Sequence, residues 1–156
     1  MLKIVSGAQT GVDRAALDVA LKENVPCGGW CPEGRKAEDG TIPESYPVQE
    51  LKGGGYRPRT KKNVQDSDGT VIIYFGQLSG GTEETLRFCL SEKKPYLLLD
   101  GREVKSDRAA ERMVDFQSTL PGRKLNFAGP RASSEPQAYE YTAKAIEKFI
   151  ELYEDQ

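Results

Sequence analysis

The stretch Thr70-Val71-Ile72-Ile73-Tyr74-Phe75 is a continuous run of β-branched and aromatic residues. Such a run predicts a strand that is buried on both faces, as in the interior of a parallel sheet. Glycines follow it at 76, 80 and 81, and Leu86, Cys89 and Leu90 then recur at helical spacing. We therefore predict a central strand, a tight turn, and a helix with these three side chains on its buried face.

The same order of elements extends in both directions from this strand. Further strands are predicted at residues 2–5, 96–99 and 125–128, and further helices begin near residues 12, 57, 106 and 134. The last helix matches a capping box at Ser134-Glu135-Pro136-Gln137 and carries an apolar stripe from Tyr139 to Tyr153. Strands that alternate with helices predict a mostly parallel sheet with helices on both faces. We expect a single α/β domain over residues 1–156, a three-layer Rossmann-like fold.

Residues 26–55 interrupt this alternation. They hold Cys27-Gly28-Gly29-Trp30-Cys31-Pro32, two further prolines and Gly53-Gly54-Gly55, and only residues 48–51 have a strand-like composition. Glycine and proline at this density predict a long functional loop or flap. We expect it to shield a bound ligand.

The composition excludes several classes of function. With 22 basic and 24 acidic side chains among 156 residues, the chain has no overall nucleic-acid signature. No apolar run approaches the roughly 20 residues of a membrane span, so we expect a cytoplasmic protein. Histidine is absent, which removes histidine-based triads and most zinc-hydrolase designs.

The three cysteines are an odd set, and a chain of this length does not need disulfides. We expect reduced thiols. Cys27 and Cys31 are not spaced as a C-x-x-C motif and lack two further ligands, so structural thiols are favoured over a metal pair. Cys89 is predicted to lie in the core.

The first candidate binding turn follows the strand at residues 2–5. In open parallel sheets the ligand lies beyond the carboxyl ends of the strands, where each chain segment turns into a helix. The turn contains Gly7, Ala8, Gln9, Thr10 and Gly11, and its small residues expose backbone N–H groups to a phosphate or carboxylate. The alternative is a plain tight turn in which Thr10 caps the helix.

The second turn, Ser79-Gly80-Gly81-Thr82, follows the strongest strand. A diglycine beside two hydroxyls makes a good anion nest at a helix N-terminus, so we predict phosphate binding here. A simple helix start capped by Thr82 is compatible with that role.

The third turn follows residues 125–128 and places Arg131 where its side chain can reach a phosphate. Arg14, Arg35, Arg57 and Arg59 are near these turns in sequence, and each is either a ligand contact or an ordinary surface charge. Asp13 could cap its helix or contact a ribose or ring nitrogen. Trp30 could stack on a planar ring or pack in the core.

The sequence resembles one known family along nearly its whole length. The resemblance rests on Gly7-Ala8-Gln9-Thr10-Gly11-Val12-Asp13-Arg14-Ala15-Ala16-Leu17-Asp18, Gly28-Gly29-Trp30-Cys31-Pro32, Gly34-Arg35-Lys36-Ala37-Glu38-Asp39-Gly40, Arg59-Thr60, Asn63-Val64, Asp66-Ser67-Asp68-Gly69-Thr70 and Gly80-Gly81-Thr82. These motifs are similar to those of the molybdenum-cofactor carrier proteins. That family is itself similar in fold to the lysine-decarboxylase-like and cytokinin-activating phosphoribohydrolase group.

The resemblance implies a homo-oligomer, a dimer or tetramer, that binds and carries or stores molybdenum cofactor (molybdopterin). This cofactor is a pterin with a dithiolene-bound metal and a phosphate, so the protein needs no metal cluster of its own. A molybdoenzyme is the implied transient partner. The implied cofactor-binding residues are Gly7, Ala8, Gln9, Thr10, Gly11, Asp13, Arg14, Arg35, Arg59, Ser79, Gly80, Gly81, Thr82 and Arg131, with no catalytic residue.

Two alternatives have a nucleotide as the ligand. A phosphoribohydrolase-like enzyme would use Glu83 or Glu84 as acid or base with Arg35 or Arg131, although the glycine turn before Thr82 is one residue shorter than the P-G-G-x-G-T-x-x-E pattern of such enzymes. A nucleotide-sensing module would bind without turnover. All three hypotheses require that the turns near Gly7 and Gly80 share one pocket.

Overall fold

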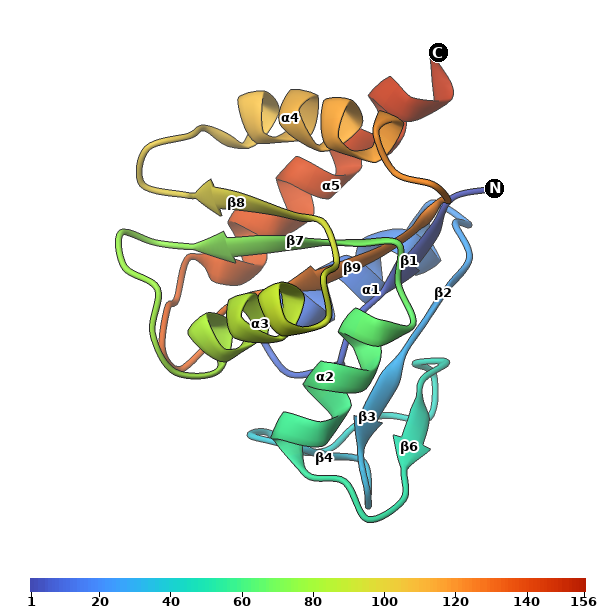
Figure 1. The fold of residues 1–156 in the computed structure, drawn as a ribbon, viewed down its shortest axis with the longest axis vertical. Helices are drawn as coiled ribbons and strands as arrows, with labels where there is room; N and C mark the ends of the chain where they lie inside the picture. Colours follow the sequence, from blue (N-terminus) through green and yellow to red (C-terminus); the bar gives the residue numbers. More distant parts are fainter.

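A five-stranded parallel sheet forms the centre of the computed structural model, which describes residues 1–156 (Figure 1). Its strands follow the spatial order β2-β1-β9-β7-β8, and each neighbouring pair is parallel. Their bounds are Cys27–Gly28 for β2, Lys3–Val5 for β1, Lys124–Ala128 for β9, Gly69–Tyr74 for β7 and Tyr96–Asp100 for β8. The predicted α/β fold with a mostly parallel sheet is confirmed.

Five helices cover the two faces of this sheet. One face carries α1 (Val12–Lys22), α4 (Ser106–Ser118) and α5 (Ala138–Glu154), and the other carries α2 (Tyr56–Gln65) and α3 (Gly80–Ser91). The alternation along β7 explains the three layers, because successive side chains of a strand point to opposite faces. Val71 and Ile73 pack in the larger cluster with α1, α4 and α5, whereas Ile72 packs against Val64 and Phe88.

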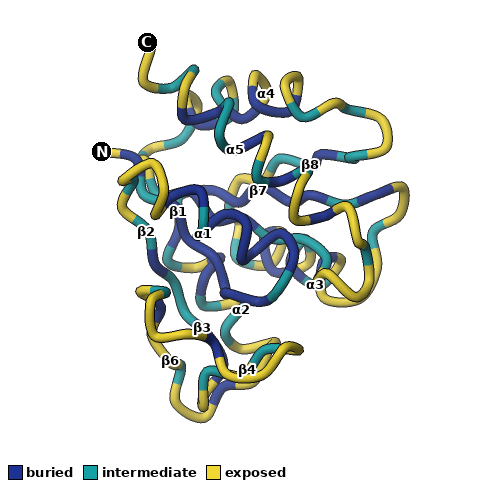
Figure 2. The backbone as a smooth tube through the Cα atoms, turned by 180° about the vertical axis from the view of Figure 1, so that it is seen from behind, coloured by how far each residue is buried: buried dark blue, intermediate teal, exposed yellow.

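The buried residues follow the sheet and the inner sides of the helices (Figure 2). Ile72, Ile73 and Phe127 are at most 1% exposed. Burying each such side chain contributes about 2 kcal/mol before the entropy of ordering it is subtracted. None of the helices is long and apolar enough to cross a lipid bilayer.

Three predictions of local packing are wrong. β7 lies inside the sheet, but the middle strand is β9, because strand order is decided by the crossover connections and not by composition. Leu90 is 58% exposed, and Phe88 takes its place beside Cys89 in the core. Tyr139 is 40% exposed and donates its hydroxyl to Asp18 of α1.

The helix starts also differ from the capping residues that we predicted. Gly11, Ser79 and Gln137 occupy the N-cap positions of α1, α3 and α5, and none donates or accepts a side-chain capping bond. The predicted capping box fails because the backbone N–H groups of Ser134 and Glu135 bond the carbonyl of Arg131, forming a separate turn before α5 begins.

Residues 26–55 are more ordered than the predicted loop. β2 joins the main sheet, β3 (Trp30–Pro32) pairs in parallel with β6 (Gln49–Leu51), and β4 (Lys36–Ala37) pairs in antiparallel with β5 (Gly40–Thr41). A small core of their own holds these strands on the first helix; its members are Ala8, Leu17, Cys31, Ile42 and Val48.

Candidate functional site

The β1–α1 turn and the β7–α3 turn line one common cavity. α1 leaves β1 toward one face of the sheet, and α3 leaves β7 toward the other. Such a switch point opens a crevice beyond the carboxyl ends of the strands. The cavity there has a volume of about 680 Å³, which is the size of a small-molecule site.

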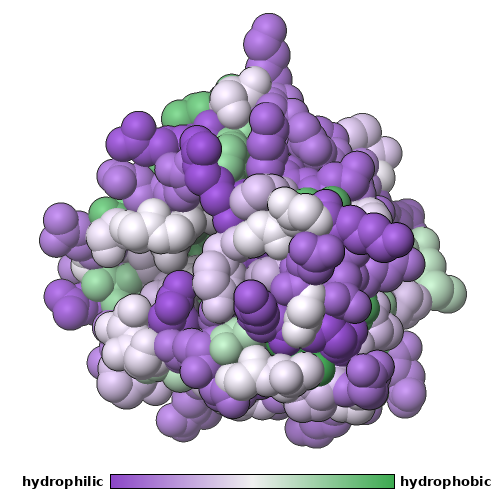
Figure 3. Space-filling model, turned by 90° about the horizontal axis from the view of Figure 1, so that it is seen from below, coloured by the Kyte–Doolittle hydropathy of each residue, from purple (hydrophilic) through white to green (hydrophobic).

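Eight of the predicted binding residues line this cavity. They are Gln9, Asp13, Arg59, Ser79, Gly80, Gly81, Thr82 and Arg131. The condition that the turns near Gly7 and Gly80 share a pocket is therefore met. Only four of the 22 lining residues are hydrophobic, and the face shown in Figure 3 is likewise mostly hydrophilic.

Four other predicted residues shape the cavity from behind its wall. Ala8 and Thr10 belong to the first turn, together with Gly7 and Gly11, but do not line the cavity. Gly11 has a φ of 80°, and a Cβ there would lie 2.3 Å from the carbonyl oxygen of Pro130. A Cβ at Gly7 would lie 2.6 Å from the guanidinium carbon of Arg59. Gly11 therefore lets the β9–α5 loop approach α1, and Gly7 makes room for the side chain of Arg59.

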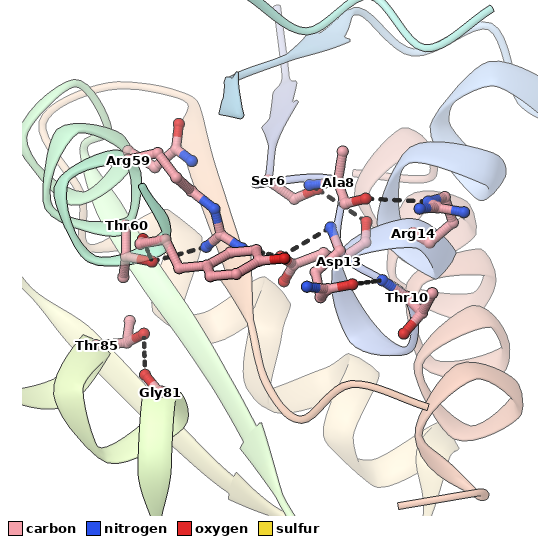
Figure 4. Close-up of polar contacts among 12 residues, drawn as sticks. Ser6, Ala8, Thr10, Asp13, Arg14, Arg59, Thr60, Gly81 and Thr85 are labelled. Carbon is pink, nitrogen blue, oxygen red and sulfur yellow. Dashed lines mark hydrogen bonds and ion pairs between the residues drawn. The ribbon is translucent and has the colours of Figure 1, made fainter. Parts of the chain in front are cut away.

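Arg14, a predicted binding residue, does not line the cavity. Its Nε donates to the carbonyl of Ala8 over 3.0 Å, and its two terminal nitrogens bond both carboxylate oxygens of Asp39 over 2.9 and 3.1 Å. Figure 4 shows this side chain on the far side of Asp13 from Arg59. A bidentate partner fixes the guanidinium, so Arg14 ties the first turn to residues 36–41.

Arg35 is likewise outside the cavity. Its guanidinium donates to four backbone carbonyls, those of Ile42, Pro43, Tyr46 and Val48, over 2.7 to 3.1 Å. These bonds use the donors that the prediction assigned to a ligand. Arg35 therefore holds the irregular segment together.

The predicted flap does not shield the cavity, because none of residues 26–55 lines it. Trp30 is half-buried and stacks on no ligand surface there: its Nε1 donates to Asp66 over 2.7 Å, and its backbone exchanges hydrogen bonds with Asn63. The segment is instead attached beside the cavity. Glu38 accepts hydrogen bonds from the hydroxyls of Thr10 and Ser133.

Sequence reasoning missed several lining residues, among them Arg102, Tyr56 and Thr85. Arg102 follows the carboxyl end of β8 just as Arg131 follows that of β9, so the rule that selected Arg131 could have selected it. Tyr56 gave no such signal. Its ring centroid lies 5.7 Å from the guanidinium carbon of Arg59 and 5.6 Å from that of Arg131, so two cations make cation–π contacts with one ring.

Four arginines and three carboxylates set the electrostatics of the cavity. Arg57 pairs with Glu84, and the Nη2 of Arg59 lies 3.7 Å from the Oδ2 of Asp13. Arg102 and Arg131 form no ion pair. Arg131 follows β9 and Arg102 follows β8, the two neighbours of β7, and the N-terminus of α3 after β7 lines the same cavity with free N–H groups that also favour an anion.

Three neighbouring groups in the cavity wall, Asp13, Gln9 and Arg59, have few hydrogen-bond partners. Asp13 is 5% exposed, and burial raises its pKa to about 6 although Arg59 acts in the opposite direction. The Nε2 of Gln9 has no hydrogen-bond partner, and neither has the Nε of Arg59. Figure 4 shows Asp13 and Arg59 turned toward one another from α1 and α2.

Comparison with known proteins places the chain in a family. A crystal structure of a "Putative molybdenum carrier protein" from Syntrophus aciditrophicus SB is 45% identical over 96% of this chain and 95% of that one, with a TM-score of 0.93. A comparison with curated proteins finds no match. The model of the circularly permutated YpsA SLOG family matches residues 4–150. The chain belongs to the circularly permutated YpsA SLOG family.

Proposed function

We propose that this protein binds and carries molybdenum cofactor in the cavity at the carboxyl ends of β1, β9, β7 and β8. The observation that carries the proposal is that Arg102 and Arg131, which form no ion pair, line the same cavity as the α3 N-terminus. A phosphate is the group that such donors bind best. The resemblance to a molybdenum carrier protein supports the choice of ligand.

The residues present fit the cofactor. The turn from Ser79 to Thr82 and the two unpaired arginines would hold the phosphate, and the wall near Gln9 and Asp13, with its unpartnered donor, would take the polar ring. The protein has no group of three His, Cys, Asp or Glu side chains that could hold a metal ion. Molybdenum would therefore stay on the sulfurs of the pterin.

Arg14 and Arg35 would act in this function as supports. Arg14 holds the Ala8 carbonyl, and Arg35 holds residues 42–48, so both stabilise the frame of the first turn without contacting the ligand. Assembly into a dimer or tetramer and delivery to a molybdoenzyme stay predictions from the resemblance.

The test is retention of cofactor by the purified protein. We expect the wild-type chain, expressed in a host that makes the cofactor, to retain molybdenum and pterin in equal amounts, measured by metal analysis and by fluorescence of the oxidised pterin. Arg131→Gln should weaken binding about 10- to 100-fold, the loss expected for one charge-assisted contact. The matched control, Arg108→Gln, changes an exposed arginine of α4 and should retain the wild-type amount.

A wild-type chain that retains neither component, even after mixing with cofactor released from a denatured molybdoenzyme, overturns the proposal. So does equal retention by the wild type and Arg131→Gln combined with release of free base from a nucleoside monophosphate. That second result would favour a nucleotide-processing enzyme.

One observation favours this second candidate. Glu84 lines the cavity at the start of α3, whereas Glu83 does not. A carboxylate beside a sugar could act as a general acid or base. Hydrolysis that is abolished by Glu84→Gln would establish it.

A further inference from the structure

The amide of Gln9 is fixed in one orientation with its donors unused. Its Oε1 accepts the backbone N–H groups of Thr10 over 3.0 Å and of Glu38 over 2.9 Å. If the amide were flipped, its NH2 group would face the backbone N–H groups of Thr10 and Glu38, which are donors themselves. Oε1 must therefore point toward these two groups, and Nε2 must point away from them. Gln9 is 6% exposed and lines the cavity, yet its Nε2 has no partner. A buried donor of this kind costs free energy unless a ligand accepts from it.

Asp13 is the complementary group in the same wall. The backbone N–H of Gln9 reaches its Oδ2 only over 3.4 Å, and Arg59 lies 3.7 Å from the same oxygen. The backbone N–H of Gly7 is the one further partner, and a carboxylate can accept about four hydrogen bonds, so part of its capacity is unused. Burying a charge with so few close partners is unfavourable, and N–H donors on a ligand would remove that cost.

The two groups select a particular chemistry. A phosphate offers no donor to Asp13 and would repel its charge. An adenine-type edge offers one donor beside a ring nitrogen that itself accepts, which cannot satisfy both carboxylate oxygens. A 2-amino-4-oxo edge, as in pterins and guanine, presents two adjacent N–H donors followed by a carbonyl, and this matches a carboxylate followed by an amide N–H.

The spacing of the strands allows one ligand to place its ring at Asp13 and its phosphate at the N-terminus of α3. Asp13 follows β1, and the α3 N-terminus follows β7, two strands away in the order β1-β9-β7. Two strand spacings amount to about 10 Å. A single ligand with a ring at one end and a phosphate at the other therefore spans both.

We propose that Asp13 and Gln9 recognise the 2-amino-4-oxo edge of the bound ring: the carboxylate accepts from the ring N3–H and the 2-amino group, and the Gln9 amide donates to the 4-oxo oxygen. This inference rests on the proposed function and names the residues that select its ring.

The experiment exchanges the hydrogen-bonding pattern of residue 13. Asp13→Asn replaces one acceptor by an N–H donor, which suits a 2,4-dioxo ring and opposes a 2-amino ring. We would titrate wild type and variant with pterin-6-ylmethyl phosphate and with its 2,4-dioxo counterpart, the lumazine, following the fluorescence of each probe. Wild type should prefer the pterin by at least about tenfold, and the variant should prefer the lumazine.

A second variant isolates Gln9. Gln9→Glu keeps an oxygen for the N–H groups of Thr10 and Glu38 but replaces the free donor by an acceptor. Both probes carry the 4-oxo group, so both should bind at least about tenfold more weakly, with their ratio unchanged.

The outcomes separate this inference from the proposed function. If wild type binds both probes equally and Asp13→Asn leaves the ratio unchanged, ring recognition by Asp13 is overturned, while phosphate binding and cofactor carriage stand. If Gln9→Glu binds both probes as tightly as wild type, the role of Gln9 is overturned. If wild type binds neither probe, both proposals fail. Circular dichroism of each variant checks that the fold is kept.

Discussion

At the scale of single residues, the buried carboxylate of Asp13 links ligand recognition to the stability of the empty protein. Burial raises its pKa from 3.8 to about 6, so the folded chain binds this proton more tightly than the unfolded chain. Ionising Asp13 between these two pKa values therefore destabilises the fold as pH rises, by about 3 kcal/mol in total.

Asp13→Asn removes this titration. We predict that the free energy of unfolding of the variant, minus that of the wild type, increases by up to about 3 kcal/mol between pH 4 and pH 7. The titration of the other carboxylates contributes equally to the free energy of unfolding of both proteins, so it cancels in this difference. Urea unfolding of both proteins across that range measures it, and a difference that decreases with pH would mean that the Arg59 ion pair outweighs burial.

At the scale of elements, three side chains attach the β4–β5 hairpin to the site: Arg14, Gln9 and Glu38. Glu38 accepts from the Thr10 hydroxyl and from both the N–H and the hydroxyl of Ser133, which joins the hairpin to the first turn and to the β9–α5 loop. The Ser133 hydroxyl, followed by that of Thr10, holds the pKa of Glu38 below its usual value. The carboxylate form is therefore the one that fastens the hairpin.

We predict that Glu38→Ala increases the amide hydrogen-exchange rate of residues 36–42 several-fold while the exchange of β7 stays unchanged, because the hairpin can open without the sheet. Exchange followed by mass spectrometry measures both segments. Glu44→Ala, in the same segment and without a side-chain hydrogen bond, serves as the control. Equal exchange in the two variants would show that Arg14 and Asp39 suffice to hold the hairpin.

The elements also show how far sequence reasoning reaches. β7, α1 and the glycine turns were predictable, because burial on both faces and helical periodicity are local patterns. The roles of Arg14 and Arg35 were not, because an arginine bonded to Asp39 or to carbonyls of the chain has the same sequence context as one that faces a ligand. Which donors remain free is decided by long-range packing. The same holds for the place of β9 in the sheet.

At the scale of the whole molecule, the net charge and the cavity have opposite signs. The chain carries a formal charge of −2, yet Arg102 and Arg131 are unpaired within a cavity that also holds two ion-paired arginines. The cavity holds four arginines against three carboxylates, and this recessed excess of positive charge focuses the potential and attracts an anion in spite of the overall charge. Association of a phosphorylated ligand should therefore depend on salt.

We predict that the association rate of pterin-6-ylmethyl phosphate, followed by stopped-flow fluorescence, decreases about tenfold between low and high ionic strength. The double variant Arg102→Gln with Arg131→Gln should associate slowly at low salt and lose most of this dependence. Arg108→Gln with Arg112→Gln makes the protein equally more negative on α4 and should keep the wild-type slope. The two double variants have the same net charge. If the association rates of both depend on salt to the same extent, the attraction comes from the charge of the whole molecule. If only the Arg102 and Arg131 variant loses the salt dependence, the attraction comes from the cavity.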